Sequence, residues 1–357
     1  MKNQIWKNGI MGVIIGDALG CPVQFLSREE IAEDPVTEMT GFGTYNMPVG
    51  TWTDDGSMTV ATLDSIRENR GINLQDIMYR FACWLTKGEY TPFGECFDNG
   101  GGTTAAILRY MRDPDVTTCG VRTDHDNGNG ALMRIMPVCL YCYEQQKDGK
   151  LDDAGAIRLI HQVSGLTHNH LRGQIACGLY YFMVRAVLDD LTEPESMAEC
   201  GGITPAASVI EDAGTEADAG NAAVEADGKD GLKDLLAKGL AEGFDFYRQD
   251  PANLVQLAYY SRLEDLNAFG ELPAALIRSS GYVVDTLEAV VWSLLNTDNF
   301  REVLLLAVNL GDDTDTVGAI CGGLAALFYG YDAIPEEWLA VIQKRDWIES
   351  LCGEMDR

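Results

Sequence analysis

The stretch Gly311-Asp312-Asp313-Thr314-Asp315-Thr316-Val317-Gly318 sets three carboxylates within four positions, directly after a glycine turn and at the start of an apolar-periodic run. Carboxylates crowded in this way repel one another unless a cation lies among them. A helix dipole stabilises each charge by only about 0.3–1 kcal/mol, so capping alone compensates weakly for the crowding. The stretch therefore predicts a helix whose N-terminus belongs to a binding site.

A second acidic cluster, Gly50-Thr51-Trp52-Thr53-Asp54-Asp55-Gly56-Ser57, opens another periodic run near the other end of the chain. Taken alone, this cluster would be an ordinary helix cap, with Thr53 or Asp54 accepting backbone N–H bonds and Asp55 at the positive end of the dipole. Because one cap residue suffices, the adjacent second acid favours a site formed where two helix N-termini meet.

Carboxylate and hydroxyl oxygens are hard ligands that suit Mg²⁺, Mn²⁺ or Ca²⁺. The two clusters therefore predict a metal-dependent hydrolase with an all-oxygen site. Gly318 and Gly322 lie four apart on one helix face, with Gly323 adjacent, and allow close approach of a neighbouring helix. Such an approach would bring the two clusters within reach of one another.

Helical periodicity dominates the chain, and no regularly spaced set of alternating β-runs is found, so the predicted fold class is all-α. We expect a single large domain over residues 1–357, because a site split so widely needs a fold that joins the chain ends. The first amphipathic run holds Ile5, Met11 and Ile15. Further helices are predicted over 54–69, 74–87, 103–112, 129–146, 152–164, 169–189, 232–248, 281–296, 299–310, 313–329 and 335–347.

Residues 192–228 differ sharply from the rest, with nine acidic residues and no basic or aromatic residue before Lys229. Such a segment buries too little apolar surface to offset its ordering entropy. It is interpreted as an acidic, low-complexity surface insertion within the domain.

The formal net charge of −29 argues against nucleic acid or an anionic membrane as a partner. The start Met-Lys-Asn-Gln-Ile-Trp is not typical of a signal peptide, and no apolar run approaches the ~20 residues of a membrane span. Ten scattered cysteines include one CxxC, Cys139 and Cys142, in an apolar stretch that favours buried thiols over zinc. A cytoplasmic, monomeric protein is expected.

Two glycine-rich turns precede predicted helices: Gly100-Gly101-Gly102-Thr103 and Asp126-Asn127-Gly128-Asn129-Gly130. Each is compatible with a plain tight turn, but exposed backbone N–H groups at such turns also cradle phosphate, so a diphosphate ligand is credible. Arg134 would contact an anion or pair with an acid. His168, in Thr167-His168-Asn169-His170, is interpreted as a substrate-contacting or structural residue and not as a zinc ligand.

Five motifs occur in an order that resembles the ADP-ribosylglycohydrolases of the dinitrogenase-reductase-activating type, over about residues 5–330. They are Gly16-Asp17-Ala18-Leu19-Gly20, Gly50 to Asp55, Gly128 to Arg134, Thr167-His168 and Gly311 to Thr316. The resemblance implies a compact orthogonal helical fold with a two-metal centre, Mg²⁺ or Mn²⁺. It implies cleavage of the glycosidic bond between ADP-ribose and an acceptor, either a protein side chain such as arginine or a small molecule.

The resemblance also implies residue roles. Thr53, Asp54 and Asp55 would ligate metal from one side, and Asp313, Asp315 and Thr316 from the other. Water would attack the anomeric carbon of the distal ribose, and Asp54 or Asp55 would accept its proton. Substrate would contact Gln24, Gly100, Gly101, Gly102, Asn127, Gly128, Asn129, Gly130 and His168.

One departure concerns Gln24, because many family members carry Glu at this place in the motif. Neutral Gln is a poor general base, so its expected role is positioning. A catalytically weak or inactive ADP-ribose-binding or crystallin-like relative, and a two-metal phosphohydrolase, stay open as alternatives.

Overall fold

The computed structural model describes residues 4–192 and 221–357. Over these residues the fold is all-α, as predicted, and β-pairing is limited to isolated bridges. The helices are α1 Ile5–Gly20, α2 Arg28–Glu33, α3 Asp54–Asn69, α4 Leu74–Lys87, α5 Gly101–Arg112, α6 Met136–Lys147, α7 Asp153–Gly165, α8 Leu171–Thr192, α9 Asn221–Arg248, α10 Leu254–Leu257, α11 Leu266–Gly270, α12 Val283–Leu295, α13 Phe300–Val308, α14 Thr314–Tyr329, α15 Glu336–Leu339 and α16 Arg345–Met355.

Three of the predicted helices are wrong in extent. The one predicted over 232–248 begins already at Asn221, as α9. The run over 129–146 is a glycine turn and a short 3₁₀ helix before α6 begins at Met136, with Pro137 in its first turn. The run over 335–347 is broken between α15 and α16 by Lys344, whose φ of +56° is left-handed. In the latter two places a local backbone feature interrupts an apolar period that continues across it.

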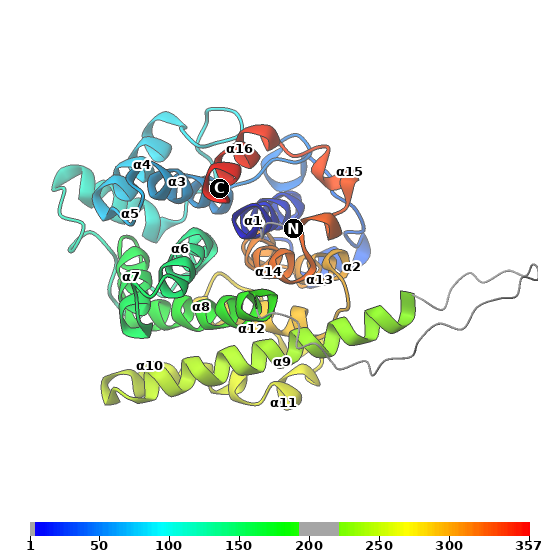
Figure 1. Ribbon diagram of the computed structural model, residues 1–357. Helices are drawn as coiled ribbons and strands as arrows, with labels where there is room; N and C mark the ends of the chain where they lie inside the picture. The colour runs from blue at the N-terminus through cyan, green and yellow to red at the C-terminus, as the bar shows by residue number, and fades with distance from the viewer. Residues whose placement is uncertain (1–3, 193–220) are drawn as a thin grey trace, which may run out of the picture.

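The predicted insertion at 192–228 lies mostly outside the described residues. Its last part, 221–228, forms the start of α9. That helix lies lengthwise along α8 and packs against it (Figure 1).

The contact between α1 and α14 is the most extensive in the described fold, and the two helices lie side by side (Figure 1). Glycines face glycines across it. A methyl group built on Gly16 would come 1.9 Å from the carbonyl oxygen of Gly318, and one on Gly322 would come 2.1 Å from that of Gly12. The close approach predicted for Gly318 and Gly322 is confirmed, and α1 is the partner helix.

The two ends of the described chain meet at the start of α1. The carboxylate of Asp356 accepts hydrogen bonds from the backbone N–H groups of Trp6 and Lys7, at 3.0 and 3.1 Å. A carboxylate at a helix N-terminus is favoured both by the free N–H groups and by the dipole. Asp356 therefore joins the residues after α16 to the first turn of α1.

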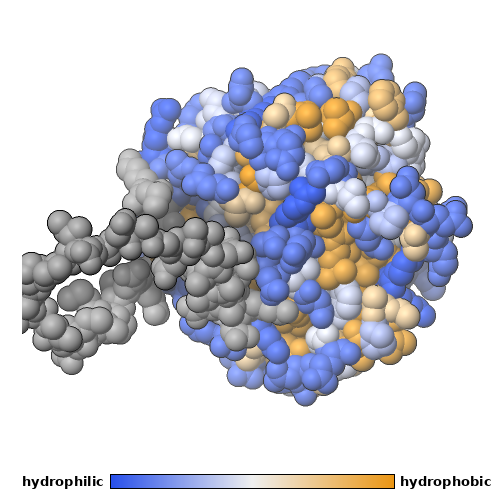
Figure 2. Space-filling model, turned by 90° about the vertical axis from the view of Figure 1, so that its right-hand side faces the viewer, coloured by the Kyte–Doolittle hydropathy of each residue, from blue (hydrophilic) through white to orange (hydrophobic). Residues whose placement is uncertain are grey.

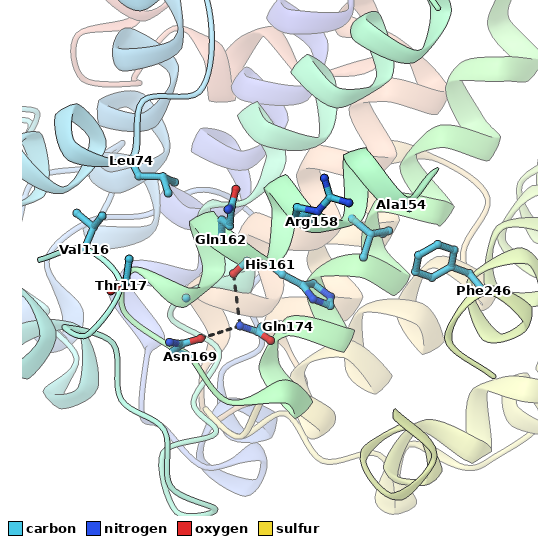
Figure 3. A pocket seen from close by; sticks show the side chains of 12 residues that line it. Leu74, Val116, Thr117, Ala154, Arg158, His161, Gln162, Asn169, Gln174 and Phe246 are labelled. Atoms are coloured by element: carbon cyan, nitrogen blue, oxygen red, sulfur yellow. Dashed lines mark hydrogen bonds between the residues drawn. The ribbon is translucent and has the colours of Figure 1, made fainter. Parts of the chain in front are cut away.

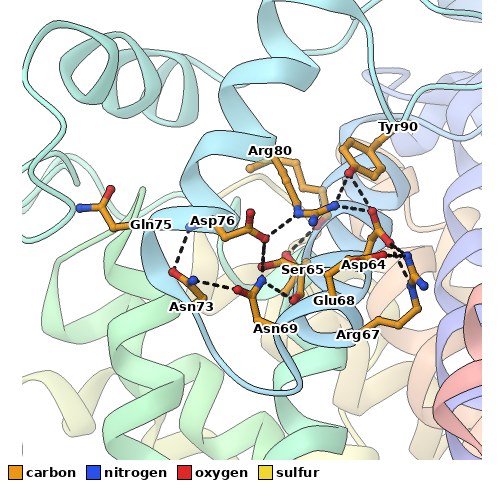
Figure 4. Close-up of polar contacts among 12 residues, drawn as sticks. Asp64, Ser65, Arg67, Glu68, Asn69, Asn73, Gln75, Asp76, Arg80 and Tyr90 are labelled. Atoms are coloured by element: carbon orange, nitrogen blue, oxygen red, sulfur yellow. Dashed lines mark hydrogen bonds and ion pairs between the residues drawn. The ribbon is translucent and has the colours of Figure 1, made fainter.

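A polar network joins α3 to α4 (Figure 4). Arg80 donates to Asp76 at 2.7 Å and also contacts Asp64, and the hydroxyl of Tyr90 donates to Asp64 at 2.9 Å. Tyr90 belongs to the segment between α4 and α5. The network therefore ties this connecting segment to the helix that carries the first acidic cluster.

On the face that Figure 2 shows, hydrophilic residues cover most of the surface, and hydrophobic residues appear between them in patches. The buried hydrophobic side chains form one cluster that includes Trp6, Trp52, Trp84 and Trp338. The cysteines within the described residues are free, and both Cys139 and Cys142 are buried. No helix in the described part of the chain is long and apolar enough to cross a membrane.

Replacing Gly16 by alanine should destabilise the protein by at least about 2 kcal/mol, because the added methyl meets backbone that cannot rotate away. Gly353→Ala in α16 is the matched control, since a methyl there meets nothing within 4 Å. The control should be neutral or stabilising by up to about 1 kcal/mol. Urea denaturation of both variants measures the difference; equal stabilities would contradict close α1–α14 packing.

Candidate functional site

The two acidic clusters meet, as predicted, at the N-termini of α3 and α14. The hydroxyl of Thr316, in the first turn of α14, lies 3.4 Å from Oδ2 of Asp55 in α3. The hydroxyl of Thr53 lies 3.2 Å from the same carboxylate oxygen. Carboxylates and hydroxyls from the two ends of the chain therefore face one another in one buried site.

The N-terminus of α3 is capped mainly by a residue from α1. The Asp17 carboxylate accepts the backbone N–H groups of Thr53, at 2.9 Å, and Gly56, at 2.7 Å. The local cap from the Thr53 hydroxyl to the Asp55 N–H is long, at 3.4 Å. Asp54 and Asp55 are therefore not needed as caps, which weakens the capping interpretation of this cluster.

The acids of the second cluster have two different environments. Asp312 is exposed, and its backbone is left-handed, with a φ of +59°. In this conformation its N–H donates to the Leu26 carbonyl at 2.8 Å. Asp313 precedes α14 but makes no side-chain cap. Asp315 is fully buried, and its Oδ1 accepts the N–H of Thr316 at 2.9 Å. Asp313 and Asp315 therefore face the site.

Burial raises the pKa values of the Asp54, Asp55, Asp313 and Asp315 carboxyls above their ordinary value. For Asp54 the next cause is the field of Asp98, for Asp55 that of Asp17, and for Asp315 that of Asp55. The pKa of Asp17 is raised to about 7, again mainly by burial. These acids gain from any positive charge placed among them.

Several buried oxygens of the site have no hydrogen-bond partner within the described residues. They are Oδ1 of Asp55, Oδ2 of Asp315, Oδ2 of Asp98 and Oε1 of Gln24. Each unpaired buried polar atom costs about 1–3 kcal/mol. Such atoms at one place indicate that a ligand completes the site.

The cavity beside the acids has a volume of about 240 Å³. Its lining combines acidic side chains with glycine backbone and an imidazole. The lining residues include Gln24, Phe25, Asp54, Asp98, Gly100, Gly101, Gly102, Thr103, Gly128, Asn129, Gly130, Met133, His168, Gly281, Asp313 and Thr316. Thr53, Asp55 and Asp315 are buried but are not among these lining residues.

Both predicted glycine turns reach the cavity. The first is the N-terminus of α5, where Gly100 is the residue before the helix and makes no side-chain cap. In the second, the Asn129 amide donates to Asp313 at 2.6 Å and to Thr286 at 2.9 Å, so this side chain points to the acids. Asn127 is not among the lining residues; its amide donates to the Asp124 carbonyl at 2.9 Å.

His168 also lines the cavity, close to both glycine turns. A methyl group built on Gly130 would come 2.7 Å from its Cε1 atom, and one built on Gly102 would come 3.1 Å from its Nε2 atom. Burial lowers the pKa of His168 to about 4, so the imidazole is neutral at ordinary pH. Arg134, which was expected to contact an anion or pair with an acid, instead donates to Thr167 and the Val163 carbonyl.

Gln24 also lines the cavity, beside Asp313. Its Nε2 donates to Oδ1 of Asp313 at 3.4 Å, and the hydroxyl of Thr44 donates to its backbone carbonyl at 2.7 Å. A glutamate here would place a further carboxylate beside that of Asp313. The amide therefore satisfies an acid that a carboxylate would repel.

Sequence reasoning missed Asp98 and gave no role to Asp17. Asp98 has a φ of +50° and directs one carboxylate oxygen into buried space at the cavity. Tyr45, which hydrogen-bonds to Asp98, packs against Phe97 with ring centroids 5.3 Å apart. The position of Asp98 directly before Asn99 and Gly100 was the available signal, because it precedes a turn already singled out.

A different cavity, of about 410 Å³, is lined by residues that include His161, Asn169 and Gln174 (Figure 3). Apolar side chains such as Leu74, Val116 and Phe246 line it together with neutral polar groups and Arg158. Gln174 there donates to the side chain of Asn169 at 2.9 Å. This cavity has no acidic lining and therefore differs in chemistry from the site at the two helix N-termini.

The fold and the site define a class of all-α proteins in which acids at two helix N-termini face a glycine-lined cavity. The ADP-ribosylglycohydrolase family model matches residues 6–357. The chain therefore belongs to the ADP-ribosylglycohydrolase family, which consists of hydrolases.

Curated relatives support this assignment. The ADP-ribosylarginine hydrolase Tri1 of Serratia proteamaculans is 27% identical, over 98% of this chain and 78% of the relative. The ADP-ribosyl-[dinitrogen reductase] glycohydrolase of Rhodospirillum rubrum is 27% identical, over 94% of this chain and 89% of the relative. A solved structure described as an ADP-ribosylglycohydrolase-related protein complex matches with a TM-score of 0.70 and 27% identity, covering 100% of this chain and 98% of that chain.

In protein treated with a chelator, Gln24→Glu should lower the melting temperature, because the introduced carboxylate would face the carboxylate of Asp313. Added Mg²⁺ or Mn²⁺ should raise the melting temperature of this variant more than that of the unchanged protein, since the extra carboxylate is a hard ligand. Each tenfold gain in affinity corresponds to about 1.4 kcal/mol.

Gln24→Met is the control, because it removes the hydrogen bond without adding charge. Scanning calorimetry with chelator and then with metal measures all three proteins. A metal-induced shift that is the same in the Glu and Met variants would contradict the placement of Gln24 beside the acids.

Proposed function

We propose that the protein hydrolyses the glycosidic bond between ADP-ribose and the side chain of arginine. The observation that carries the proposal is the pair of unpaired, buried carboxylate oxygens of Asp55 and Asp315 at a site whose cavity is lined by further acids, glycine backbone and His168. The acids suit the reacting ribose and its hydroxyls. The N-terminus of α5 suits the diphosphate, because it presents free N–H groups.

The reaction needs a water whose oxygen bonds to the anomeric carbon of the distal ribose as the bond to the acceptor nitrogen breaks. The electron pair of that bond stays on the guanidine nitrogen. One proton of the attacking water stays on the new anomeric hydroxyl, and the other passes to the carboxylate of Asp54 or Asp55 and from there to the guanidine nitrogen. Asp54 lines the cavity and Asp55 is not among the lining residues, so Asp54 is placed to contact water first.

The site residues fit a divalent cation such as Mg²⁺ or Mn²⁺. The donors are hard oxygens, and several have no other partner. Within the described residues, no three acid, His or Cys side chains form a metal-binding group by themselves. The residues that would hold the cation are Asp54, Asp55, Asp313 and Asp315, together with the hydroxyls of Thr53 and Thr316, once the carboxylates turn toward the bound ion. When bound, the ions supply positive charge that offsets the crowded acids and favours deprotonated water.

The acceptor is inferred from charge. Arginine carries a planar cation, and carboxylates bind it with paired hydrogen bonds. Asp98 directs an unpaired oxygen to the cavity, and the chain as a whole has a net charge of −29, which attracts cations. The relative named as an ADP-ribosylarginine hydrolase supports this acceptor, and the relative named for dinitrogen reductase supports a protein as the substrate.

Chelation should abolish hydrolysis of an ADP-ribosylarginine peptide, and Mg²⁺ or Mn²⁺ should restore it. Asp55→Asn should lower kcat by roughly 10²–10⁴-fold without loss of melting temperature, since it removes a buried charge and no cap. Asp312→Asn is the matched control: it lies in an acidic cluster but is exposed, and it should stay active.

The products decide between the functions still open. Free ADP-ribose supports the proposal, AMP would indicate a phosphohydrolase, and no product with ADP-ribose bound would indicate an inactive binding protein. Activity in metal-free protein would contradict the metal part of the proposal, and a destabilised Asp55→Asn would restore the capping interpretation.

Asp98→Asn should reduce kcat/KM for ADP-ribosylarginine by roughly 10- to 100-fold, the loss expected for a hydrogen bond to a charged group. Hydrolysis of ADP-ribosylserine should change little, because serine carries no cation. Steady-state kinetics on both substrates measures the ratio, with Asp34→Asn, an exposed acid, as control. An equal loss on both substrates would show that Asp98 serves the ribose and not the acceptor.

A further inference from the structure

Arg134 is fully buried, and its guanidinium has no carboxylate partner among the described residues. Its Nη2 donates to the Thr167 hydroxyl at 2.8 Å, and its Cζ lies 4.6 Å from the ring centroid of Phe81. Burial lowers its pKa to about 10, so it stays charged at neutral pH. A guanidinium has five N–H donors and no acceptor, so Arg134 can only donate to Thr167.

The same hydroxyl connects Arg134 to the cavity. Thr167 Oγ1 lies 2.9 Å from Nδ1 of His168. Because Arg134 fills an acceptor position of the hydroxyl, the hydroxyl hydrogen is free to point at Nδ1. Among the described residues, the Thr167 hydroxyl has hydrogen bonds only with Arg134 and His168.

The reverse arrangement is less favourable. If Nδ1 carried the proton and donated to Thr167, the threonine hydrogen would be buried without an acceptor. That orphan costs about 1–3 kcal/mol. The network therefore favours a neutral imidazole with its proton on Nε2.

The backbone fixes the position of this imidazole. The Thr167 carbonyl accepts the N–H of Val121 at 2.9 Å, and the His168 N–H donates to Ser164 at 2.9 Å. Nε2 faces the cavity close to Gly102, where a built methyl group would lie 3.1 Å away. A larger residue at that turn would fill the space in front of the imidazole.

We propose that Arg134, acting through the Thr167 hydroxyl, is a positioning residue that holds His168 as a fixed Nε2–H donor toward the cavity. The ligand class that this donor takes is an oxygen acceptor, such as a hydroxyl or phosphate oxygen of ADP-ribose. The choice of ligand rests on the proposed function, whereas the position of the proton does not. Burial, which keeps the imidazole neutral, prevents Nδ1 from becoming a second donor.

The proton can be located directly by long-range ¹H–¹⁵N correlation spectroscopy of ligand-free protein with ¹⁵N-labelled histidine. The chain has only 4 histidines, and the signals lost in His168→Gln assign the one that matters. In the unchanged protein, Nε2 of His168 should show the shift of a protonated nitrogen and Nδ1 that of an unprotonated one. The opposite pattern would overturn the proposal.

Thr167→Val removes the hydroxyl at nearly constant volume and should give a mixture of both tautomers. Thr167→Ser keeps the hydroxyl and should restore the single tautomer. Thr62→Val is the matched control, since Thr62 is also buried but bonds the Met58 carbonyl at 2.7 Å within α3. We call the chain of hydrogen bonds from Arg134 through Thr167 to His168 the relay. A spectrum of Thr167→Val equal to that of the unchanged protein would refute the role of the relay.

Kinetics supply a second readout. Thr167→Val should raise KM for the ADP-ribosyl substrate about tenfold, and Thr167→Ser should return it to normal. Because the tautomer is read without substrate, the relay is tested even if no hydrolysis is found. A protein with the expected tautomers but no ADP-ribosyl hydrolysis would disprove the proposed function and leave the relay intact.

Discussion

The glycine contact between α1 and α14 is the constraint on which the rest of the structure depends. Backbone meets backbone there without intervening side chains, since a methyl group built on Gly16 would lie only 1.9 Å from the carbonyl oxygen of Gly318. The same contact continues to the end of α1, where a methyl on Gly20 would come 2.4 Å from the backbone nitrogen of Asp315. The last turns of α1 therefore fix the position of the first turn of α14. Asp17, within those turns, also holds the start of α3.

One helix thus aligns two N-termini whose acids would otherwise move apart. The acids are crowded and buried, and their pKa values are raised, so the folded chain holds them together at an electrostatic cost. Backbone packing and the hydrogen bonds of Asp17 offset that cost. The result is a site arranged before any ligand binds, in which little reorganisation is needed when charge develops in a reaction.

Many of the helices and both acidic clusters could be predicted from the sequence, because local residue patterns determine them. The bounds of α3 and α4 follow from their periodicity and turn residues, and the acidic clusters follow from their unusual density. The breaks before Met136 and at Lys344 could not be predicted, since the apolar period continues across both. Asp98 directly precedes a glycine turn already singled out, but it was missed because one acid beside a turn does not by itself indicate a site. Asp17 was visible only as part of a motif, because its role is to cap a helix far along the chain.

The separation of the contacting residues along the chain has a consequence for synthesis. Gly12 and Gly322 touch, although almost the whole chain lies between them, and closing so long a loop carries an entropic cost before any contact forms. A ribosome makes α1 long before α14. The glycine face of α1 therefore has no partner while most of the polypeptide is being translated. The acids are brought together only once residues 314–329 have emerged, so a truncated chain carries the first cluster without the site.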